Sequence, residues 1–164
     1  MRENETYDLN GCWDVNKKTY ICKECGNKGK SVKEITLRNH VKESKLESIK
    51  NFEGFYFCET HTCQVIYFNN EQSFYLHKED VKTRVGLKET YDPIPVCYCF
   101  GWTREKIFNQ IKQQGFSTAV QEISAKVKAG ECACDIYNPS GKCCLGEVSK
   151  VVKRGMKVFQ IERR

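Results

Sequence analysis

Eleven cysteines in 164 residues constrain this chain more than any other feature of its sequence. In the first half, two residues separate Cys22 from Cys25 and four residues separate Cys58 from Cys63. Such a spacing lets both thiolates of one tight turn face a single ion, and two such knuckles complete a tetrahedral zinc site. The sequence therefore predicts a structural zinc site formed by these four cysteines.

One histidine leaves an alternative open at this site. His61 lies inside the second knuckle, in Cys58-Glu-Thr-His-Thr-Cys63, and could replace Cys58 or Cys63 as a ligand. Four cysteines already saturate a zinc ion, so the favoured interpretation is a surface residue or a hydrogen-bond donor to the ligands. His40 and His77 have no ligand spacing and are interpreted as ordinary polar residues.

The cysteines also bear on the cellular compartment. The N-terminal sequence has no apolar region typical of a signal peptide. The apolar stretches elsewhere in the sequence are far shorter than the ~20 residues that cross a bilayer. Without export, the thiols are expected to stay reduced in the cytoplasm, where short cysteine spacings indicate metal ligands more often than disulfides. The odd count of eleven agrees with that interpretation.

Pro93 and Pro95 mark the predicted boundary between two modules, because both prolines have a fixed φ and bias their neighbours towards extended backbone. The 40% hydrophobic share includes the cysteines and falls to roughly one third without them, so each small module has a lean core that metals would support. We predict an α+β chain. A β-rich zinc module spans 1–91, with 1–19 as an extension; a helical module spans 96–155; and a basic tail spans 156–164.

The first module shows short strand signals. Residues 54–58, 63–68 and 73–76 are rich in aromatic and β-branched side chains, and the polar residues 69–72 indicate a turn. These segments predict a small meander around the cysteines. Residues 32–41 are expected to form a strand followed by a loop, and residues 45–50 a helical turn.

The second module changes to a helical period. Thr103 is a candidate N-cap for a helix over 104–113 that Gly115 ends. Ser117 is expected to cap a second helix reaching residue 129, with Gly130 as its stop. A third helix is predicted from about 144 to 154 and closed by Gly155.

A second cysteine set lies at the ends of these helices. Cys97-Tyr-Cys99 is a C-x-C pair, and Cys134 follows Cys99 after 34 residues that hold the two predicted helices. This arrangement resembles the [2Fe-2S] domain of the bacterioferritin-associated ferredoxin (BFD) type. That domain closes in C-x2-C, whereas this chain has Cys134-Asp-Ile-Tyr-Asn-Pro-Ser-Gly-Lys-Cys143-Cys144, so the closing half departs from the pattern.

The longer loop resembles the N-terminal region of the CopZ family of copper chaperones, in which a zinc module precedes a [2Fe-2S] module. The likeness runs from Tyr20 to about Val148. It is carried by five segments: Phe55-Tyr-Phe-Cys58, Val65-Ile-Tyr-Phe68, Asp80-Val-Lys-Thr-Arg-Val-Gly86, Val96-Cys-Tyr-Cys99 and Asn138-Pro-Ser-Gly-Lys-Cys-Cys144. The resemblance implies zinc on the first four cysteines and a [2Fe-2S] cluster on Cys97, Cys99, Cys134 and one of Cys143 or Cys144.

Of these last two we prefer Cys144 as the fourth ligand, because adjacent cysteines do not readily bind one cluster together. Cys12, Cys132 and Cys143 are then spare. Residues 139–142 are expected to turn successive N–H groups towards one point, and the following helix N-terminus would also favour an anionic cluster. Lys142 and Arg104 could add positive field, and Phe100 and Trp102 are expected to shield the cluster from water.

Charge and motifs narrow the function. The net charge is +6, and residues 150–164 hold six basic residues against one acid. A zinc-ribbon module that binds nucleic acid or protein through this tail is the alternative; nucleic acid is disfavoured because the tail is remote from the knuckles and has one aromatic residue, Phe159. No catalytic constellation is evident.

We therefore expect a non-enzymatic iron-sulfur and zinc protein, a one-electron redox module that serves copper or iron handling with a protein redox or metal-transfer partner. The sequence contains no M-x-C-x-x-C motif for Cu(I), so a separate copper-binding domain is a candidate partner.

Overall fold

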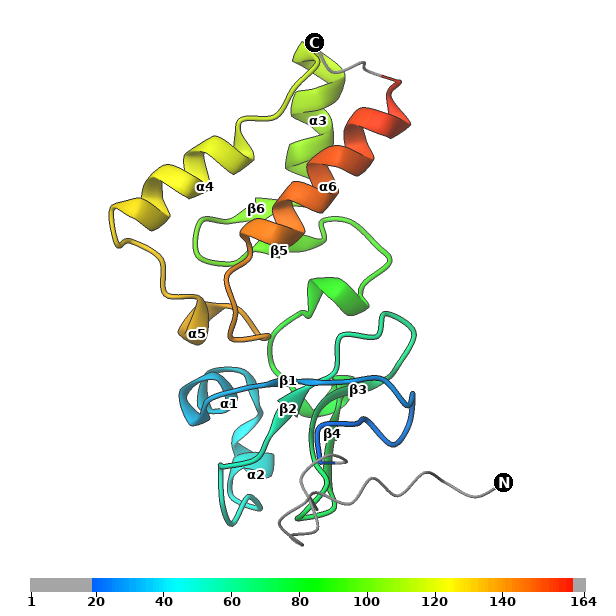
Figure 1. The fold of residues 1–164 in the computed structure, drawn as a ribbon, viewed down its shortest axis with the longest axis vertical. Helices are drawn as coiled ribbons and strands as arrows, with labels where there is room; N and C mark the ends of the chain where they lie inside the picture. Colours follow the sequence, from blue (N-terminus) through cyan, green and yellow to red (C-terminus); the bar gives the residue numbers. More distant parts are fainter. Residues whose placement is uncertain (1–18, 161–164) are drawn as a thin grey trace, which may run out of the picture.

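The computed structural model describes residues 19–160 and places a four-stranded antiparallel sheet in the first half of that range. Its strands pair in chain order, as Figure 1 shows. They are β1 (Lys30–Ser31), β2 (Tyr56–Phe57), β3 (Val65–Asn69) and β4 (Phe74–His77). The meander predicted from the aromatic segments is therefore confirmed, with the bounds of β2, β3 and β4 shifted by one or two residues, whereas β1 was not predicted.

The central strand β3 is buried over its whole length. A register shift between Val65 and Tyr67 turns Ile66 and Tyr67 towards the same apolar cluster, while Val65 and Phe68 pack among the cysteines on the opposite face. A bulge of this kind lets two consecutive side chains share one face. The strand thus separates a helix-covered core from a cysteine-lined one.

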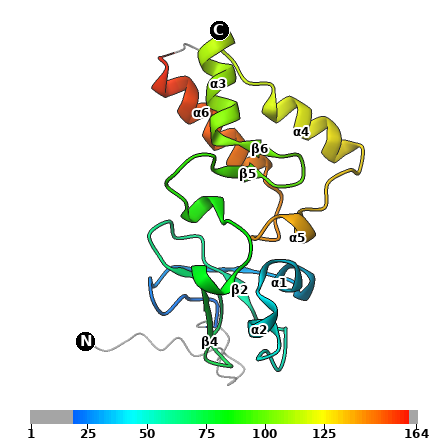
Figure 2. The same cartoon turned by 180° about the vertical axis from the view of Figure 1, so that it is seen from behind.

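Helices α1 (Glu34–His40) and α2 (Glu43–Leu46) cover the first of these faces, as Figure 2 shows from behind. The prediction of a strand and a loop over 32–41 is wrong, because Thr36, Leu37 and His40 are buried at helical spacing. The helical turn predicted over 45–50 begins two residues earlier, at Glu43. Two short 3-10 turns follow β4: η2 (Lys78–Asp80) and η3 (Gly86–Lys88).

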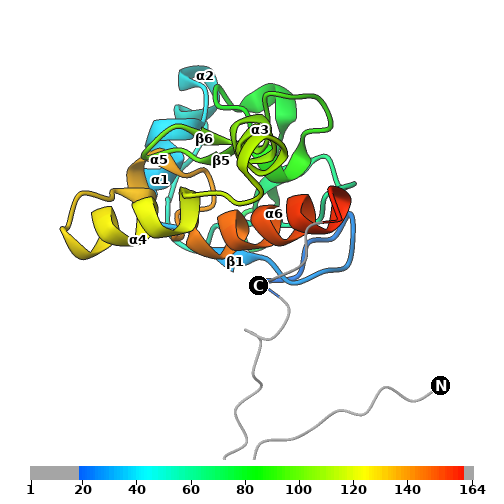
Figure 3. The same cartoon turned by 90° about the horizontal axis from the view of Figure 1, so that it is seen from above.

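The second half consists of a hairpin and helices. The hairpin pairs β5 (Pro95–Cys97) with β6 (Trp102–Thr103), and Cys99 lies in the turn between them. The helices are α3 (Arg104–Gln114), α4 (Ala119–Lys128), α5 (Cys134–Tyr137) and α6 (Leu145–Val158). Figure 3 shows α6 running beside α3 and α4, and apolar side chains from all three helices form one cluster.

The helix ends agree with the predicted caps in α3 and nearly so in α4. Thr103 Oγ1 accepts a hydrogen bond from the Lys106 N–H at 3.2 Å, and Gly115 ends α3 in the left-handed region at φ 83°. Ser117 Oγ accepts from the Ala119 N–H at 3.2 Å, one residue before the observed N-cap, Thr118.

The third predicted helix is longer than expected, because α6 continues through Gly155 to Val158. Gly155 is not a stop signal but a close-packing position: a Cβ there would lie 2.6 Å from Ile111 Cδ1 on α3. Phe159 then packs edge-on against Phe108 with ring centroids 5.9 Å apart. Residues 156–158, assigned to the basic tail by sequence, are part of this helix.

The two halves meet through polar contacts between segments remote in sequence. Thr36 Oγ1 of α1 donates to the Asp135 carbonyl of α5 at 2.6 Å, and the hydroxyl of the buried Tyr67 donates to the Pro139 carbonyl. A Cβ on Gly141 would lie 2.9 Å from Thr36 Oγ1, so the loop after α5 fits closely against α1.

The α+β class predicted from the sequence is confirmed. The apolar clusters divide near the proline pair, with members at 22–87 on one side and 96–159 on the other. Between residues 19 and 160, no helix is long and apolar enough to cross a membrane.

Candidate metal centres

The first cysteine set converges on a single point. The Sγ atoms of Cys22 and Cys63 lie 3.9 Å apart, those of Cys25 and Cys58 lie 3.7 Å apart, and all four lie within 4.8 Å of one another. A tetrahedral site with metal–sulfur distances of about 2.3 Å has sulfur–sulfur edges of about 3.8 Å. The four sulfurs therefore fit one zinc ion without rearrangement.

Local backbone geometry explains why the knuckles bring these sulfurs together. In the first knuckle the Gly26 N–H donates to the Cys22 carbonyl at 2.7 Å, and Gly26 adopts a φ of 73°, which a residue with a side chain rarely does. The Cys22 N–H donates in turn to the Asn27 carbonyl at 2.9 Å. The second knuckle closes with the Cys63 N–H donating to the Thr60 carbonyl at 3.1 Å.

Three of these thiols differ in acidity. Burial raises the pKa of Cys22 to about 12 and also raises that of Cys63. Burial acts in the same direction on Cys25, but hydrogen bonds from Thr60 Oγ1 and the Asn27 backbone outweigh it and lower the pKa of Cys25 to about 6. Since metals bind thiolates, Cys25 offers a ligand more readily at neutral pH than Cys22 or Cys63 does.

Sequence reasoning missed two polar groups that surround this set. Thr60 Oγ1 lies 3.3 Å from Cys25 Sγ, and the buried Lys88 places its Nζ 3.6 Å from Cys58 Sγ. A lysine 25 residues beyond the last knuckle cysteine gives no signal by spacing. His61 is exposed and bonds through Nδ1 to the Leu87 carbonyl at 2.6 Å, as expected for a surface residue beside the site.

The second cysteine set forms two pairs instead of one cluster of four. Cys99 Sγ and Cys134 Sγ lie 3.6 Å apart, and the thiols of Cys97 and Cys144 share a hydrogen bond. Within residues 19–160, no three of the second-half sulfurs lie within 4.8 Å of one another, so this set does not match a single tetrahedral ion. Two separated pairs fit a two-iron cluster, in which each iron takes two thiolates.

Burial separates the two pairs. Cys97 and Cys144 are 0% and 2% exposed, whereas Cys99 and Cys134 are half-buried. The hydrogen bond from Cys144 lowers the pKa of Cys97 to about 7, while the same bond and burial raise the pKa of Cys144. Burial raises the pKa of Cys134 to about 12.

The remaining cysteines belong to neither of these pairs. Cys143 is exposed although it precedes the buried Cys144, which agrees with the preference for Cys144. Cys132 is half-buried, and Cys12 lies outside the described residues.

Aromatic side chains pack beside the inner pair, as expected from the sequence. Phe100 and Trp102 are partly buried against the cluster of apolar residues that contains Cys97 and Cys144. Lys126, which sequence reasoning did not single out, lies over the Phe100 ring at 4.7 Å and favours the thiolate of Cys97. Arg104 instead pairs with Asp92, with Nη2 and Oδ2 2.8 Å apart.

The loop before Cys144 differs from its predicted role. The Ser140 N–H donates to Asn138 Oδ1 at 3.0 Å, the Gly141 N–H to the Asn138 carbonyl at 2.8 Å, and the Lys142 N–H to Ser140 Oγ at 3.3 Å. These donors are satisfied inside the loop, so they do not form an anion-binding nest. The N-terminus of α6, which begins directly after Cys144, remains close to that sulfur.

Other candidate ligands have structural partners. His77, Glu79 and Asp80 are grouped, but Asp80 Oδ2 accepts from the His77 N–H at 2.9 Å and its Oδ1 pairs with Lys45 at 3.3 Å. His77 Nε2 lies 2.7 Å from Glu24 in the first knuckle. His40, expected to be an ordinary polar residue, is buried instead; its Nδ1 bonds to Thr83 Oγ1 at 2.7 Å.

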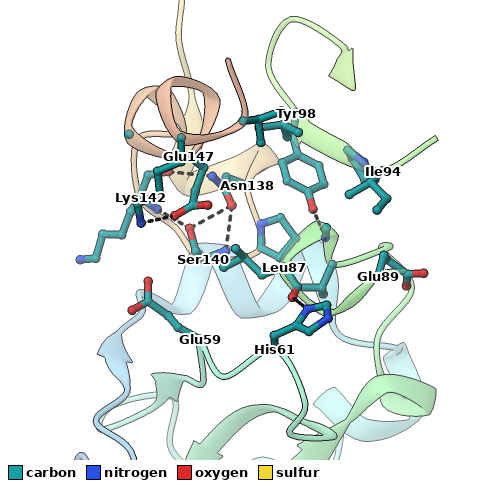
Figure 4. Close-up of a pocket in the computed structure, with 18 of the residues that line it drawn as sticks. Glu59, His61, Leu87, Glu89, Ile94, Tyr98, Asn138, Ser140, Lys142 and Glu147 are labelled. Atoms are coloured by element: carbon teal, nitrogen blue, oxygen red, sulfur yellow. Dashed lines mark hydrogen bonds and ion pairs between the residues drawn. The ribbon is translucent and has the colours of Figure 1, made fainter. Parts of the chain in front are cut away.

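A cleft of about 710 Å³ lies between the two cysteine sets, lined by residues of both halves. Figure 4 shows Glu59, His61 and Leu87 facing Tyr98 and Lys142 across it. Several exposed basic residues belong to α6: Lys150, Lys153, Arg154 and Lys157. Lys150 pairs with Glu147 at 2.9 Å, and the last two arginines of the sequence lie outside the described residues.

Comparisons with known proteins match the region of the first cysteine set and extend beyond it. Residues 19–82, which contain the first four cysteines, match the CopZ family described as "Zinc binding domain". The copper chaperone CopZ of Archaeoglobus fulgidus is 41% identical over 123 residues, covering 75% of this chain and 57% of that protein. The chain thus spans little more than half of the length of this curated relative.

A solved structure extends the likeness to the fold. The X-ray structure of the A. fulgidus CopZ N-terminal domain is 37% identical in sequence, with a TM-score of 0.68. The similarity covers 80% of this chain and 96% of that domain, so the chain shares the fold and the family of this domain.

Proposed function

Because the chain belongs to the family of the CopZ N-terminal domain, we propose that it is a non-enzymatic metal-handling protein with a zinc ion and a [2Fe-2S] cluster. Its role is to pass single electrons to a metal ion or to a partner protein. One observation carries the proposal: the two cysteine sets differ in geometry, with four convergent sulfurs in the first and two separate pairs in the second.

The zinc site has a structural role. Cys22, Cys25, Cys58 and Cys63 would occupy every position of a tetrahedral ion, which leaves no open position for a substrate. The closed set also lies against Val65 and Phe68, so a bound ion joins the two knuckles to the sheet. Metal binding of this kind contributes directly to the folding free energy of a small module.

The second set is the redox site. Cys97 and Cys144 would hold the inner iron, and Cys99 and Cys134 the outer one. Such a cluster takes up or gives up one electron at a potential set by the hydrogen bonds and solvent around its sulfurs. Because the outer pair is half-buried, that edge is the route by which an electron reaches a partner.

The metal ion served by this electron is a further part of the proposal. The relative is named a copper chaperone, and this chain covers 57% of it. Copper handling would follow if a Cu(I)-binding domain receives the reduced ion, with one electron passing from the reduced cluster to Cu(II). We propose a cytoplasmic location and a separate copper-binding domain as the partner.

Metal analysis of anaerobically purified protein tests the assignment. We expect brown protein with about two iron, two sulfide and one zinc per chain, and a visible spectrum that one electron from dithionite bleaches. Colourless protein with two zinc ions and no sulfide would refute the redox role and favour the zinc-ribbon alternative.

The two adjacent cysteines supply a matched pair of variants. Cys144→Ser should abolish the reducible spectrum, because it removes a buried member of the inner pair. Cys143→Ser should leave the spectrum intact. The opposite result would assign the fourth ligand to Cys143.

A further inference from the structure

One short segment touches both cysteine sets. Residues 84–88, which we call the bridging turn, include the 3-10 turn η3 and lie along the cleft. On one side these residues contact the second zinc knuckle. On the other side they contact the side chain of Tyr98, the residue between Cys97 and Cys99 in the sequence. Figure 4 shows Leu87 of this turn between His61 and Tyr98.

On the zinc side, the turn delivers a buried cation. Lys88 is 3% exposed, and its Nζ lies 3.6 Å from Cys58 Sγ. The same ammonium donates to the Thr60 carbonyl and, at 3.2 Å, to the Cys63 carbonyl. These three acceptors all belong to the second knuckle, so the lysine both contacts a ligand sulfur and holds the knuckle backbone.

The charge of Lys88 requires a counter-charge. Burying an ammonium is unfavourable unless an anion compensates it, and no carboxylate in residues 19–160 forms an ion pair with Lys88. Four thiolates on a Zn²⁺ ion carry a net charge of −2, and they are the anion that this ammonium contacts. The position of Lys88 is therefore explained by a loaded zinc site.

On the cluster side, the turn is fixed to the C-x-C segment. The Gly86 N–H donates to the Tyr98 hydroxyl at 2.8 Å, and this hydroxyl donates to the Arg84 carbonyl at 2.9 Å. A Cβ on Gly86 would lie 1.9 Å from the Pro95 carbonyl oxygen, so the turn has no free space towards β5. Displacement of the turn towards β5 must therefore move β5, and displacement away from it breaks the hydrogen bonds with Tyr98.

We propose that Lys88 is a positioning residue of the zinc site and that the bridging turn couples zinc occupancy to the stability of the cluster site. The inference rests on the proposed function, since it assumes that both sites are loaded. With zinc bound, Lys88 holds the turn against the knuckle, and the turn holds Tyr98. Without zinc, the ammonium loses its counter-charge, the turn is released, and the segment from Cys97 to Cys99 loses its support.

The first experiment measures zinc transfer from the loaded protein to a chromophoric chelator. Lys88→Met removes the charge at nearly equal length and should speed zinc release about tenfold or more, in line with other groups that contact metal ligands. Lys82→Met is the matched control, because that lysine is exposed and its ammonium pairs with Glu43 at 3.9 Å; this variant should release zinc like the wild type. Equal rates for Lys88→Met and Lys82→Met would overturn the role of Lys88.

A charge-preserving variant covers the case in which Lys88→Met is recovered without zinc. Lys88→Arg should then retain zinc, because its guanidinium keeps the counter-charge for the thiolates. An arginine variant that loses zinc as readily as the methionine variant would contradict the charge argument.

The second experiment measures the half-life of the cluster absorbance in a double-mutant cycle. Lys88→Met should shorten this half-life severalfold in the wild-type background, although Lys88 contacts no cluster cysteine. Tyr98→Phe removes the hydroxyl that ties the turn to the cluster, so adding Lys88→Met to it should have no further effect. Additive effects of the two substitutions would refute coupling through the turn.

Failure of this inference is distinguishable from failure of the proposed function. Wild-type protein without iron or zinc refutes the proposed function itself. Loaded wild-type protein with unaltered zinc release in Lys88→Met refutes only the inference.

Discussion

The hydrogen bond between Tyr67 and Pro139 offers a sharp test of how the two halves support each other. Tyr67 lies in β3, is fully buried, and packs against Phe57 with ring centroids 5.8 Å apart. Its hydroxyl donates to the Pro139 carbonyl, 72 residues away in the sequence. Tyr67→Phe removes this donor and leaves the ring in place, so the substitution isolates one contact between the halves.

The expected loss of unfolding free energy is substantial for the removal of a single oxygen atom. Pro139 is buried, so its carbonyl would lose a partner without gaining water in exchange. Leaving such an acceptor unsatisfied costs about 1–3 kcal/mol. A loss of about 2 kcal/mol in unfolding free energy lowers the midpoint of thermal unfolding of a chain of this size by roughly 4–8 °C. Burial raises the pKa of Tyr67, so the hydroxyl stays protonated and the loss should not vary with pH near neutrality.

Thermal denaturation of loaded protein, followed by circular dichroism at one scan rate, measures the effect. Tyr137→Phe is the control, because it makes the same chemical change in a tyrosine that is 55% exposed and lies two residues before Pro139. The control should unfold like the wild type. Equal midpoints for the two variants would show that the hydrogen bond contributes nothing and that the halves are joined by other contacts.

Three further predictions concern packing, pH and thiol access. Gly155→Ala should lower the unfolding free energy by about 1 kcal/mol, because overpacking against α3 exceeds the gain in helix propensity. Gly146→Ala, with open space around the glycine, should raise the unfolding free energy by about 0.5–1 kcal/mol. The denaturant midpoints of both variants test this contrast. Burial lowers the pKa of His40 to about 4, so the neutral imidazole is favoured in the fold. The free energy of unfolding should therefore fall by up to about 3 kcal/mol as the pH drops from about 6.5 towards 4. In His40→Gln the midpoint of unfolding should depend less on pH in that window. Iodoacetamide should label Cys143 of loaded protein before any cysteine of the two metal sets, as peptide mapping would show; protection of Cys143 would contradict its exposure.

Cysteine spacing was sufficient to group the zinc ligands, because both knuckles are local and each is closed by its own backbone hydrogen bonds. The ends of α3 were predictable for the same reason: Thr103 and Gly115 act within a single turn of the helix. The pairing in the second set was not predictable, because the contacts of Cys97 with Cys144 and of Cys99 with Cys134 depend on how the intervening helices pack.

The wrong expectations share a cause in tertiary packing. Residues 32–41 contain the β-branched Val32, Ile35 and Thr36, and local propensity favoured a strand there, but Leu37 packs in the core and Thr36 bonds to α5. Gly155 resembles a helix stop in sequence, yet its missing side chain serves the approach of α6 to α3. The contact of Lys88 with Cys58 could not be predicted from the sequence, because nothing in the neighbouring residues of the sequence indicates that the Lys88 ammonium is buried.

The burial of β3 on both faces has a consequence for how the first half responds to its surroundings. One face is covered by helices, but the other is covered by the cysteine knuckles and their aromatic neighbours, where another protein would place a second layer of secondary structure. A zinc ion on these four cysteines would hold that layer, and its contribution to stability would follow mass action. The stability of the first half should therefore depend on the free zinc concentration around the protein as well as on its amino-acid sequence.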